Sequence, residues 1–204
     1  QQPLKDILKY QTTVSPRGNG SMISNVIIEN PRGMVSYYVR IENKSNRMRK
    51  YHIYLYDKSQ SANTENSVFA KADTLNTLLW PSAADSAFCI GSYVSRNSWI
   101  SSGGKEVTNP EKIGNISDFS GCGPRIDGYM KPDIVAPGEN IISVRDRSVY
   151  NIPTDHWVDN DGITGGPTNY YVMKGTSMST PIAAGIAATM LSRSPKALPH
   201  DIYK

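Results

Sequence analysis

The chain has 204 residues, a formal net charge of +4, and apolar side chains at 38% of its positions. That length allows one large hydrophobic core or two small ones. No apolar run is long enough to span a membrane, and the basic residues are scattered along the chain, so the composition predicts neither a membrane span nor a nucleic-acid partner.

Residues 1–74 are predicted to be β-rich. Three runs rich in Val, Ile and Tyr are separated by turn residues, and we expect them to be strands: Ile23–Glu29, Met34–Ile41 and Tyr51–Tyr56. Antiparallel strands with one solvated face suit the partial alternation in these runs. We therefore expect the segment to form part of a small β-sandwich.

An alternative gives residues 1–74 a function of their own, as a module that binds carbohydrate or peptide. An exposed aromatic platform would favour this alternative, and its side chains would be Tyr37, Tyr38, Tyr51, Tyr54 and Tyr56. Core packing and strand propensity explain the same tyrosines more simply.

Residues 75–204 carry a different pattern. Short apolar runs at Ala87–Val94 and Asp133–Val135 have a Gly or Pro within them or close after them, which is typical of buried strands in an α/β sheet. Two polar stretches, residues 95–116 and 145–169, are long for loops in a compact domain.

The chain holds two cysteines, Cys89 and Cys122. We interpret both as buried thiols that pack as small hydrophobic side chains. A disulfide between them is the alternative, and two cysteines alone do not indicate a redox compartment.

A helix of small residues is predicted to begin at Ser177 and to end near Pro195. Pro181 suits the first turn, where a missing N–H costs nothing. Gly185 indicates close packing in a deep core, because glycine otherwise lowers helix stability. The unpaired N–H groups at the helix start would favour a serine that generates an oxyanion beside itself, and an ordinary serine cap is the alternative. A second helix is expected to begin around Pro199.

Several segments follow one another in a recognisable order: Trp80–Ala83, Phe88–Tyr93, Phe119–Pro124, Lys131–Gly138 and Gly175–Pro181. Together they resemble the motifs of the subtilisin-like serine proteases, the subtilases of peptidase family S8. The resemblance implies an α/β fold class, with the C-terminal portion of a subtilisin-like parallel-sheet domain in residues 75–204 and a β-rich, sandwich-like segment in residues 1–74. Some subtilases carry an inserted β-sandwich, and residues 1–74 resemble part of such an insert.

By the same resemblance, Ser177 is the nucleophile of an endopeptidase and forms an acyl-enzyme, while its backbone N–H contributes to the oxyanion hole. Thr176 helps to position that region. Trp80 and Pro81 would line the substrate cleft and be joined by a cis peptide bond. The implied substrate is a polypeptide, and the implied location is secreted or at the cell envelope.

The rest of the family's catalytic machinery matches no segment of the chain. His52, His156 and His200 each lack the Gly that follows the catalytic histidine, and the aspartate and oxyanion-asparagine motifs do not occur. We therefore expect the catalytic Asp, His and Asn to lie in the rest of the catalytic domain, before residue 1, and this chain alone to be inactive. Two alternatives stay open: a dyad of Asp155 and His156 that serves Ser177, and a pseudoprotease that uses the fold as a scaffold.

No cofactor is predicted. Carboxylates alternate in Asp159–Gly162, as they do in calcium loops, but the distal Glu of such a loop is missing. We interpret the segment as an exposed acidic turn, with calcium binding as the alternative.

Overall fold

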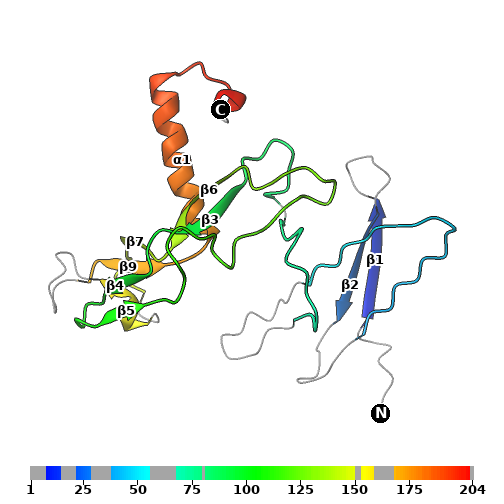
Figure 1. The fold of residues 1–204 in the computed structure, drawn as a ribbon, viewed down its shortest axis with the longest axis horizontal. Helices are drawn as coiled ribbons and strands as arrows, with labels where there is room; N and C mark the ends of the chain where they lie inside the picture. Colours follow the sequence, from blue (N-terminus) through cyan, green and yellow to red (C-terminus); the bar gives the residue numbers. More distant parts are fainter. Residues whose placement is uncertain are drawn as a thin grey trace, which may run out of the picture. The chain divides into compact units, whose positions relative to one another are not determined.

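The computed structural model describes residues 8–14, 22–28, 38–55, 68–79, 81–149, 153–158 and 168–202 (Figure 1). The chain divides into two compact units, Gln1–Tyr51 and His52–Lys204. Each unit has its own internal architecture and is described by itself.

The described residues of the first unit contain one antiparallel pair of strands. Strand β1 (Leu8–Val14) pairs with β2 (Met22–Ile28), with Leu8 opposite Ile28 and Val14 opposite Met22. The expected strand Ile23–Glu29 is confirmed as β2 to within a residue at each end. Strand β1 was not expected, although β-branched or aromatic residues recur in its sequence.

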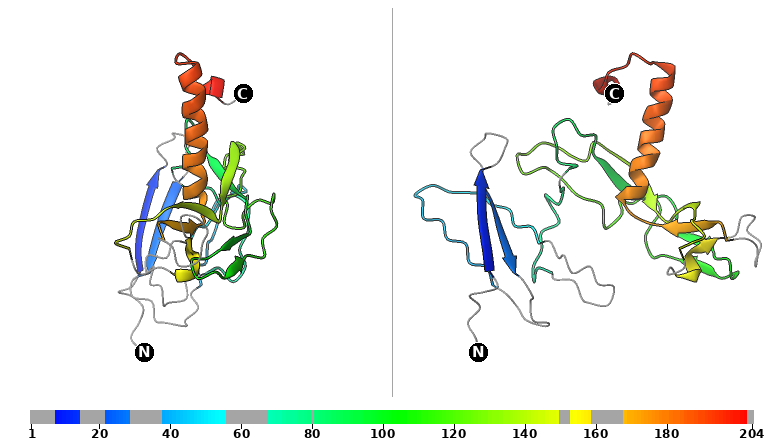
Figure 2. Two further views of the ribbon diagram at one scale, coloured as in Figure 1. Left: turned by 90° about the vertical axis from the view of Figure 1, so that its left-hand side faces the viewer. Right: turned by 180° about the vertical axis from the view of Figure 1, so that it is seen from behind.

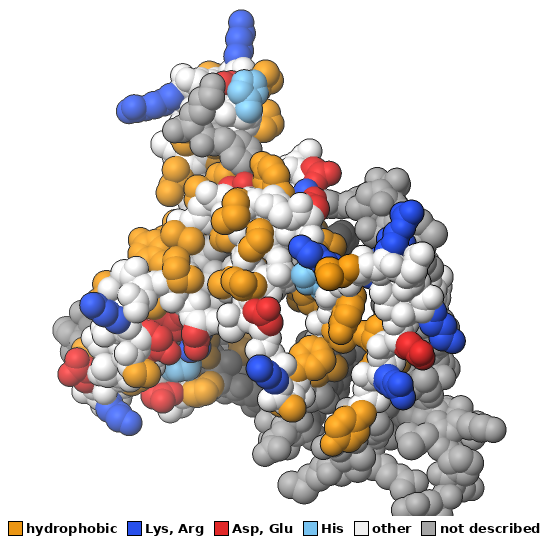
Figure 3. All heavy atoms as spheres, turned by 45° about the vertical axis from the view of Figure 1, so that its right-hand side comes forward, with side chains coloured by type: hydrophobic (Ala, Val, Ile, Leu, Met, Phe, Trp, Pro, Cys, Tyr) orange, Lys and Arg blue, Asp and Glu red, His pale blue; other side chains and the backbone are white. Residues whose placement is uncertain are grey.

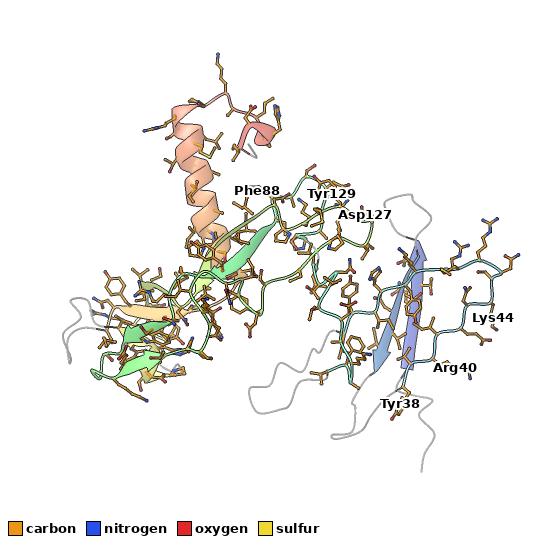
Figure 4. All side chains as sticks on the ribbon, in the orientation of Figure 1. Tyr38, Arg40, Lys44, Phe88, Asp127 and Tyr129 are labelled. Atoms are coloured by element: carbon orange, nitrogen blue, oxygen red, sulfur yellow. The ribbon has the colours of Figure 1, made fainter. Side chains whose placement is uncertain are left out.

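Two other predicted strands are not found in the part of the chain that the structure describes. Residues 38–41 and 51–55 form irregular chain, and Figure 4 shows Tyr38 and Arg40 in the first of these segments. The Tyr38 side chain is 93% exposed and that of Tyr51 is 65% exposed. Strand propensity expresses packing against neighbouring strands, and among the described residues no strand pairs with these segments.

The second unit is built around a parallel strand pair. Strand β3 (Ile90–Val94) pairs with β6 (Ile134–Glu139) in parallel, with Ile90 opposite Ile134. Helix α1 (Thr176–Arg193) packs against both strands, as Figures 1 and 2 show. The α/β fold class is therefore confirmed, and both expected strands of residues 75–204 belong to its sheet.

Short strands interrupt the two segments that the sequence predicts to be loops. In the first segment, β4 (Ser98–Ile100) and β5 (Glu106–Thr108) pair as an antiparallel hairpin. Beyond β6, a three-stranded antiparallel sheet has the order β7–β9–β8 and is formed by Ile141–Val144, Tyr170–Met173 and Trp157–Val158. A 3-10 helix at Thr154–His156 precedes β8, and a final short helix, α2, comprises Pro199–Ile202.

Helix α1 is far less buried than the sequence predicts. Ser179 and Ala183 are its buried residues, whereas Ile186 is 58% exposed, and Figure 3 shows hydrophobic side chains at the surface. A Cβ added at Gly185 would meet no atom within 4 Å, so the expected close packing is not found among the described residues. The strands that α1 packs against, β3 and β6, meet its first turns, and the later turns extend beyond them (Figure 2).

Two buried basic side chains anchor the loop that leads into β6, in which Figure 4 labels Asp127 and Tyr129. Arg125 is 8% exposed and forms ion pairs with Asp85 and Asp127. Further along, the ammonium group of Lys131 lies 2.7 Å from Asp133 Oδ2 and donates to the carbonyl of Ala87 at 2.6 Å. These contacts fix the loop on both sides of its turn and so position the start of β6.

The two cysteines are both free thiols. Cys89 is 3% exposed, and burial raises the pKa of its thiol. Cys122 is half-buried. The prediction of thiols that act as small core side chains is therefore confirmed for Cys89 and only partly for Cys122.

Within the described ranges, no helix combines the length and the hydropathy that crossing a lipid bilayer would need.

Candidate active site

Helix α1 places Ser177 second in its first turn. The N-cap is Gly175, whose φ of 149° lies in a region where side chains strain the backbone. Ser177 is exposed, and its N–H is one of the first four of the helix, which have no acceptor inside it. The start of α1 therefore presents a hydroxyl and backbone donors to solvent.

The residues that flank Ser177 shape the same turn. Thr176 is half-buried, and its carbonyl accepts a hydrogen bond from Thr180 Oγ1 at 2.9 Å. Pro181 is the sixth residue of α1, so its expected place in the first turn is wrong. Because Pro181 has no N–H, the carbonyl of Ser177 lacks the usual helical donor four residues later.

Gly138, in β6, allows α1 to approach the sheet closely. Its carbonyl accepts the N–H of Gly175 at 2.9 Å. A Cβ at Gly138 would overlap the hydroxyl oxygens of Ser179 and Ser92 and would lie against the Gly175 carbonyl. Both serines are 0% exposed, so they have no room to move aside. Glycine at this position therefore sets the distance between β6 and the turn that carries Ser177.

A buried serine network joins the segments that the sequence places far apart. The hydroxyls of Ser92 and Ser117 lie 2.8 Å apart, and the N–H of Ser92 donates to Ser120 Oγ at 3.0 Å. Ser92 belongs to β3, while Ser117 and Ser120 lie beside Phe119. The motif segments around Phe88 and Phe119 therefore meet next to β6 and α1.

Sequence reasoning missed an ion pair at the corner where the end of β6 meets the segment that leads into α1. Glu139, the last residue of β6, is 0% exposed, and Lys174 Nζ lies 3.3 Å from its Oε1. The same ammonium group lies 5.9 Å from the centroid of the Phe119 ring. A charged residue at the end of an apolar strand was the available signal, but the sequence does not show which residue would pair with it.

The described contacts of the three histidines do not involve Ser177. The ring of His156 lies edge-on to Trp99, with 5.5 Å between centroids, and its Nδ1 lies 3.5 Å from the Tyr171 hydroxyl. His200 lies 3.1 Å from Asp201, and His52 is exposed. No histidine hydrogen-bonds to Ser177 in this structure, which describes all three.

Asp155 supports the same packing beside His156. Its backbone carbonyl accepts the indole N–H of Trp99 at 2.9 Å. Burial raises the pKa of Tyr171, and the carboxylate of Asp155 raises it further. The neighbouring cavity, of about 370 Å³, borders the segment that leads into α1, and its lining comprises Asn109, Asn140, His156, Tyr171, Val172, Met173 and Lys174.

Two predicted features fall on residues that the structure leaves undescribed. Trp80 is one of them, so the conformation of the Trp80–Pro81 bond stays a prediction, while Pro81 itself is exposed. The acidic segment Asp159–Gly162 is the other. Within the described ranges, no three His, Cys, Asp or Glu side chains gather closely enough to hold a metal ion.

Comparison with known proteins identifies the family to which the chain belongs. The model of the subtilase family matches residues 40–204, which is most of the chain. Among curated proteins, the chain is 41% identical over 87 residues to the serine protease AprX of Bacillus subtilis, an alignment that covers 43% of this chain and 18% of that protein.

Two further relatives agree with this match. The subtilisin-like protease SBT1.2 of Arabidopsis thaliana is 35% identical over 106 residues, covering 48% of this chain and 12% of the relative. The minor extracellular protease Vpr of Bacillus subtilis is 42% identical over 82 residues, covering 40% and 8% respectively. The alignments thus span less than a fifth of the length of each of these three relatives. The extent of the family match is what assigns the chain: it belongs to the subtilase family.

Proposed function

We propose that the chain is the C-terminal portion of the catalytic domain of a serine endopeptidase, and that Ser177 is the nucleophile. The observation that carries this proposal is the exposed Ser177 in the first turn of α1. The turn is tied to β6 through the bond between Gly175 and Gly138. In the proposed division, residues 75–204 belong to the catalytic domain and residues 1–74 to an insert.

The mechanism assigns one step to each group at the start of α1. Ser177 Oγ forms a bond to the carbonyl carbon of the scissile peptide, and its proton passes to a general base. The backbone N–H of Ser177, kept in place by Thr176 and Gly175, stabilises the negative charge that develops on the carbonyl oxygen. The C–N bond then breaks, the base returns the proton to the departing amine, and water hydrolyses the acyl-enzyme.

The general base, its aspartate and the second oxyanion donor belong to the remainder of the protein in this proposal. A serine without an adjacent base is a weak nucleophile, and the described histidines lie elsewhere. The proposed substrate is a polypeptide, and the proposed location is secreted or at the cell envelope. The relatives support this reading through their names, which describe a serine protease for AprX and an extracellular protease for Vpr.

Hydrolysis of an unfolded polypeptide by the full-length protein tests the proposal. Ser177→Ala should lower kcat by about 10⁶-fold, the loss established for removal of the nucleophile in subtilisin. Ser192→Ala is the matched control, because Ser192 is exposed near the other end of the same helix and should keep full activity. Wild-type activity that persists in Ser177→Ala would exclude Ser177 as the nucleophile.

A pseudoprotease is the second candidate, and the partners of the described histidines, which are other than Ser177, are compatible with it. The full-length protein would then bind polypeptides without cleaving them. The residues encoded before residue 1 separate the two candidates, because the enzyme needs a catalytic histidine and aspartate there.

A further inference from the structure

Glu139 is a buried carboxylate with a single basic neighbour among the described residues. Its side chain is 0% exposed, and neither carboxylate oxygen receives a hydrogen bond from the described residues. Lys174 Nζ, 3.3 Å from Oε1, makes an ion pair with it. A buried charge is unfavourable without a partner, and removing one member of such a pair strands the other. Glu139 therefore depends on Lys174.

The pair joins the two chain segments that define the start of α1. Gly138 and Glu139 end β6, while Lys174 and Gly175 lead into the helix. The backbone bond from Gly175 N–H to the Gly138 carbonyl links the same two segments at 2.9 Å. One neutral bond and one ionic contact thus fix the corner, and Ser177 lies two residues beyond it.

The position of the Lys174 ammonium group connects a third chain segment, the one around Phe119, to this corner. Lys174 Nζ lies over the ring of Phe119, 5.9 Å from its centroid, and Phe119 lies beside Ser120, whose hydroxyl accepts the N–H of Ser92 in β3. The Lys174 side chain is 49% exposed, so the ammonium group keeps part of its hydration while it neutralises the carboxylate. A single lysine therefore links β6, the Phe119 segment and the start of α1.

We propose that Lys174 and Glu139 are a positioning pair for the reaction: they hold the turn that carries Ser177 so that its hydroxyl and N–H keep their geometry. This proposal rests on the proposed function, because it assigns the pair to the reaction of Ser177. Neither residue touches the substrate in this account. A misplacement of about 1 Å at reacting groups costs on the order of 100-fold in rate, so the pair should affect the rate of attack by Ser177.

The test measures labelling of Ser177 by a fluorophosphonate in the full-length protein, together with kcat and KM for a peptide substrate. Lys174→Met should lower the labelling rate constant and kcat by about 10- to 100-fold and leave KM unchanged. Lys174→Arg, which keeps the cation, should retain most of the rate. The double variant Lys174→Met with Glu139→Gln should recover part of the loss, because no buried charge is then left unpaired.

A second ion pair, in the segment that leads into β6, provides the control. Lys131 and Asp133 stand just before β6, 2.7 Å apart, with side chains 1% and 10% exposed. Lys131→Met should lower thermal stability as Lys174→Met does but leave the labelling rate unchanged at a temperature where both variants are folded. If Lys174→Met does not accumulate as folded protein, Glu139→Gln, which preserves size and shape, carries the same test.

The outcomes separate this proposal from the one that it rests on. A wild-type protein that is not labelled at Ser177 would overturn both. A labelled wild type whose Lys174→Met and Glu139→Gln variants react at the wild-type rate would overturn the positioning role alone. Equal losses of rate in the Lys174 and Lys131 variants would also overturn it, because the effect would then belong to general stability.

Discussion

Gly138→Ala should destabilise the second unit through a steric conflict between β6 and α1. The added Cβ would overlap the hydroxyls of Ser179 and Ser92 and press on the carbonyl of Gly175. Overpacking a rigid core costs about 1–3 kcal/mol, and we expect about 3 kcal/mol here because one of the three atoms is backbone. That is a large share of the 5–15 kcal/mol that stabilises a typical domain.

Urea unfolding of the 204-residue chain, followed by circular dichroism, measures this change. With an m-value of about 2–3 kcal/mol/M, the unfolding midpoint of Gly138→Ala should fall by about 1 M. Gly185→Ala is the matched control: its Cβ would meet no atom within 4 Å, and alanine should stabilise the helix by about 1 kcal/mol. A midpoint for Gly138→Ala equal to that of the wild type would show that α1 does not lie against β6 as described.

Three further predictions concern the loop before β6 and its neighbours. Lys131→Met should lower the free energy of unfolding by about 3–5 kcal/mol, because the carboxylate of Asp133 loses its cation and, among the described residues, keeps only the N–H of Cys89 as a donor. Adding Asp133→Asn to the same chain should restore part of the lost free energy in urea titrations. The ion pair and hydrogen bond from Arg125 lower the pKa of Asp127 to about 2. The stabilisation from Asp127 is therefore complete above its unfolded pKa near 4 and lost as the pH falls toward 2. When the free energy of unfolding is measured against pH, Asp127→Asn should remove the part of the slope that lies between these two pH values. An unchanged slope in Asp127→Asn would contradict the assignment. Iodoacetamide should alkylate Cys122 faster than Cys89, whose thiol is buried and has a raised pKa; mass spectrometry of the peptides decides the order.

The sequence predicted the helix and strands whose ends are marked by nearby residues. The run that became β3 contains Gly91, the run that became β6 contains Pro137 and ends at Glu139, and helix α1 has a glycine before it and Ser194 after it. These signals lie within a few residues of each element, so a sequence contains them. The motif around Ser177, the proposed nucleophile, is of the same kind, because a helix start and its capping residues are contiguous.

The errors and omissions concern contacts between distant segments. The run at residues 51–55 has strand-forming residues but no described strand beside it, and the small residues of α1 do not reveal how much of the chain covers the helix. The pairing of Glu139 with Lys174 joins residues that are far apart in sequence. Such partners depend on the fold, so no local pattern could have identified them.

Labelling of Ser177 by a fluorophosphonate, with identification of the modified peptide by mass spectrometry, tests the central claim most directly. We predict that the full-length protein is labelled at Ser177 and that the isolated 204-residue chain, which lacks the proposed base, is labelled far more slowly. Efficient labelling of Ser177 in the isolated chain would contradict the claim that its activating groups lie elsewhere in the protein. A full-length protein that the probe does not modify at Ser177 would contradict the assignment of Ser177 as the nucleophile.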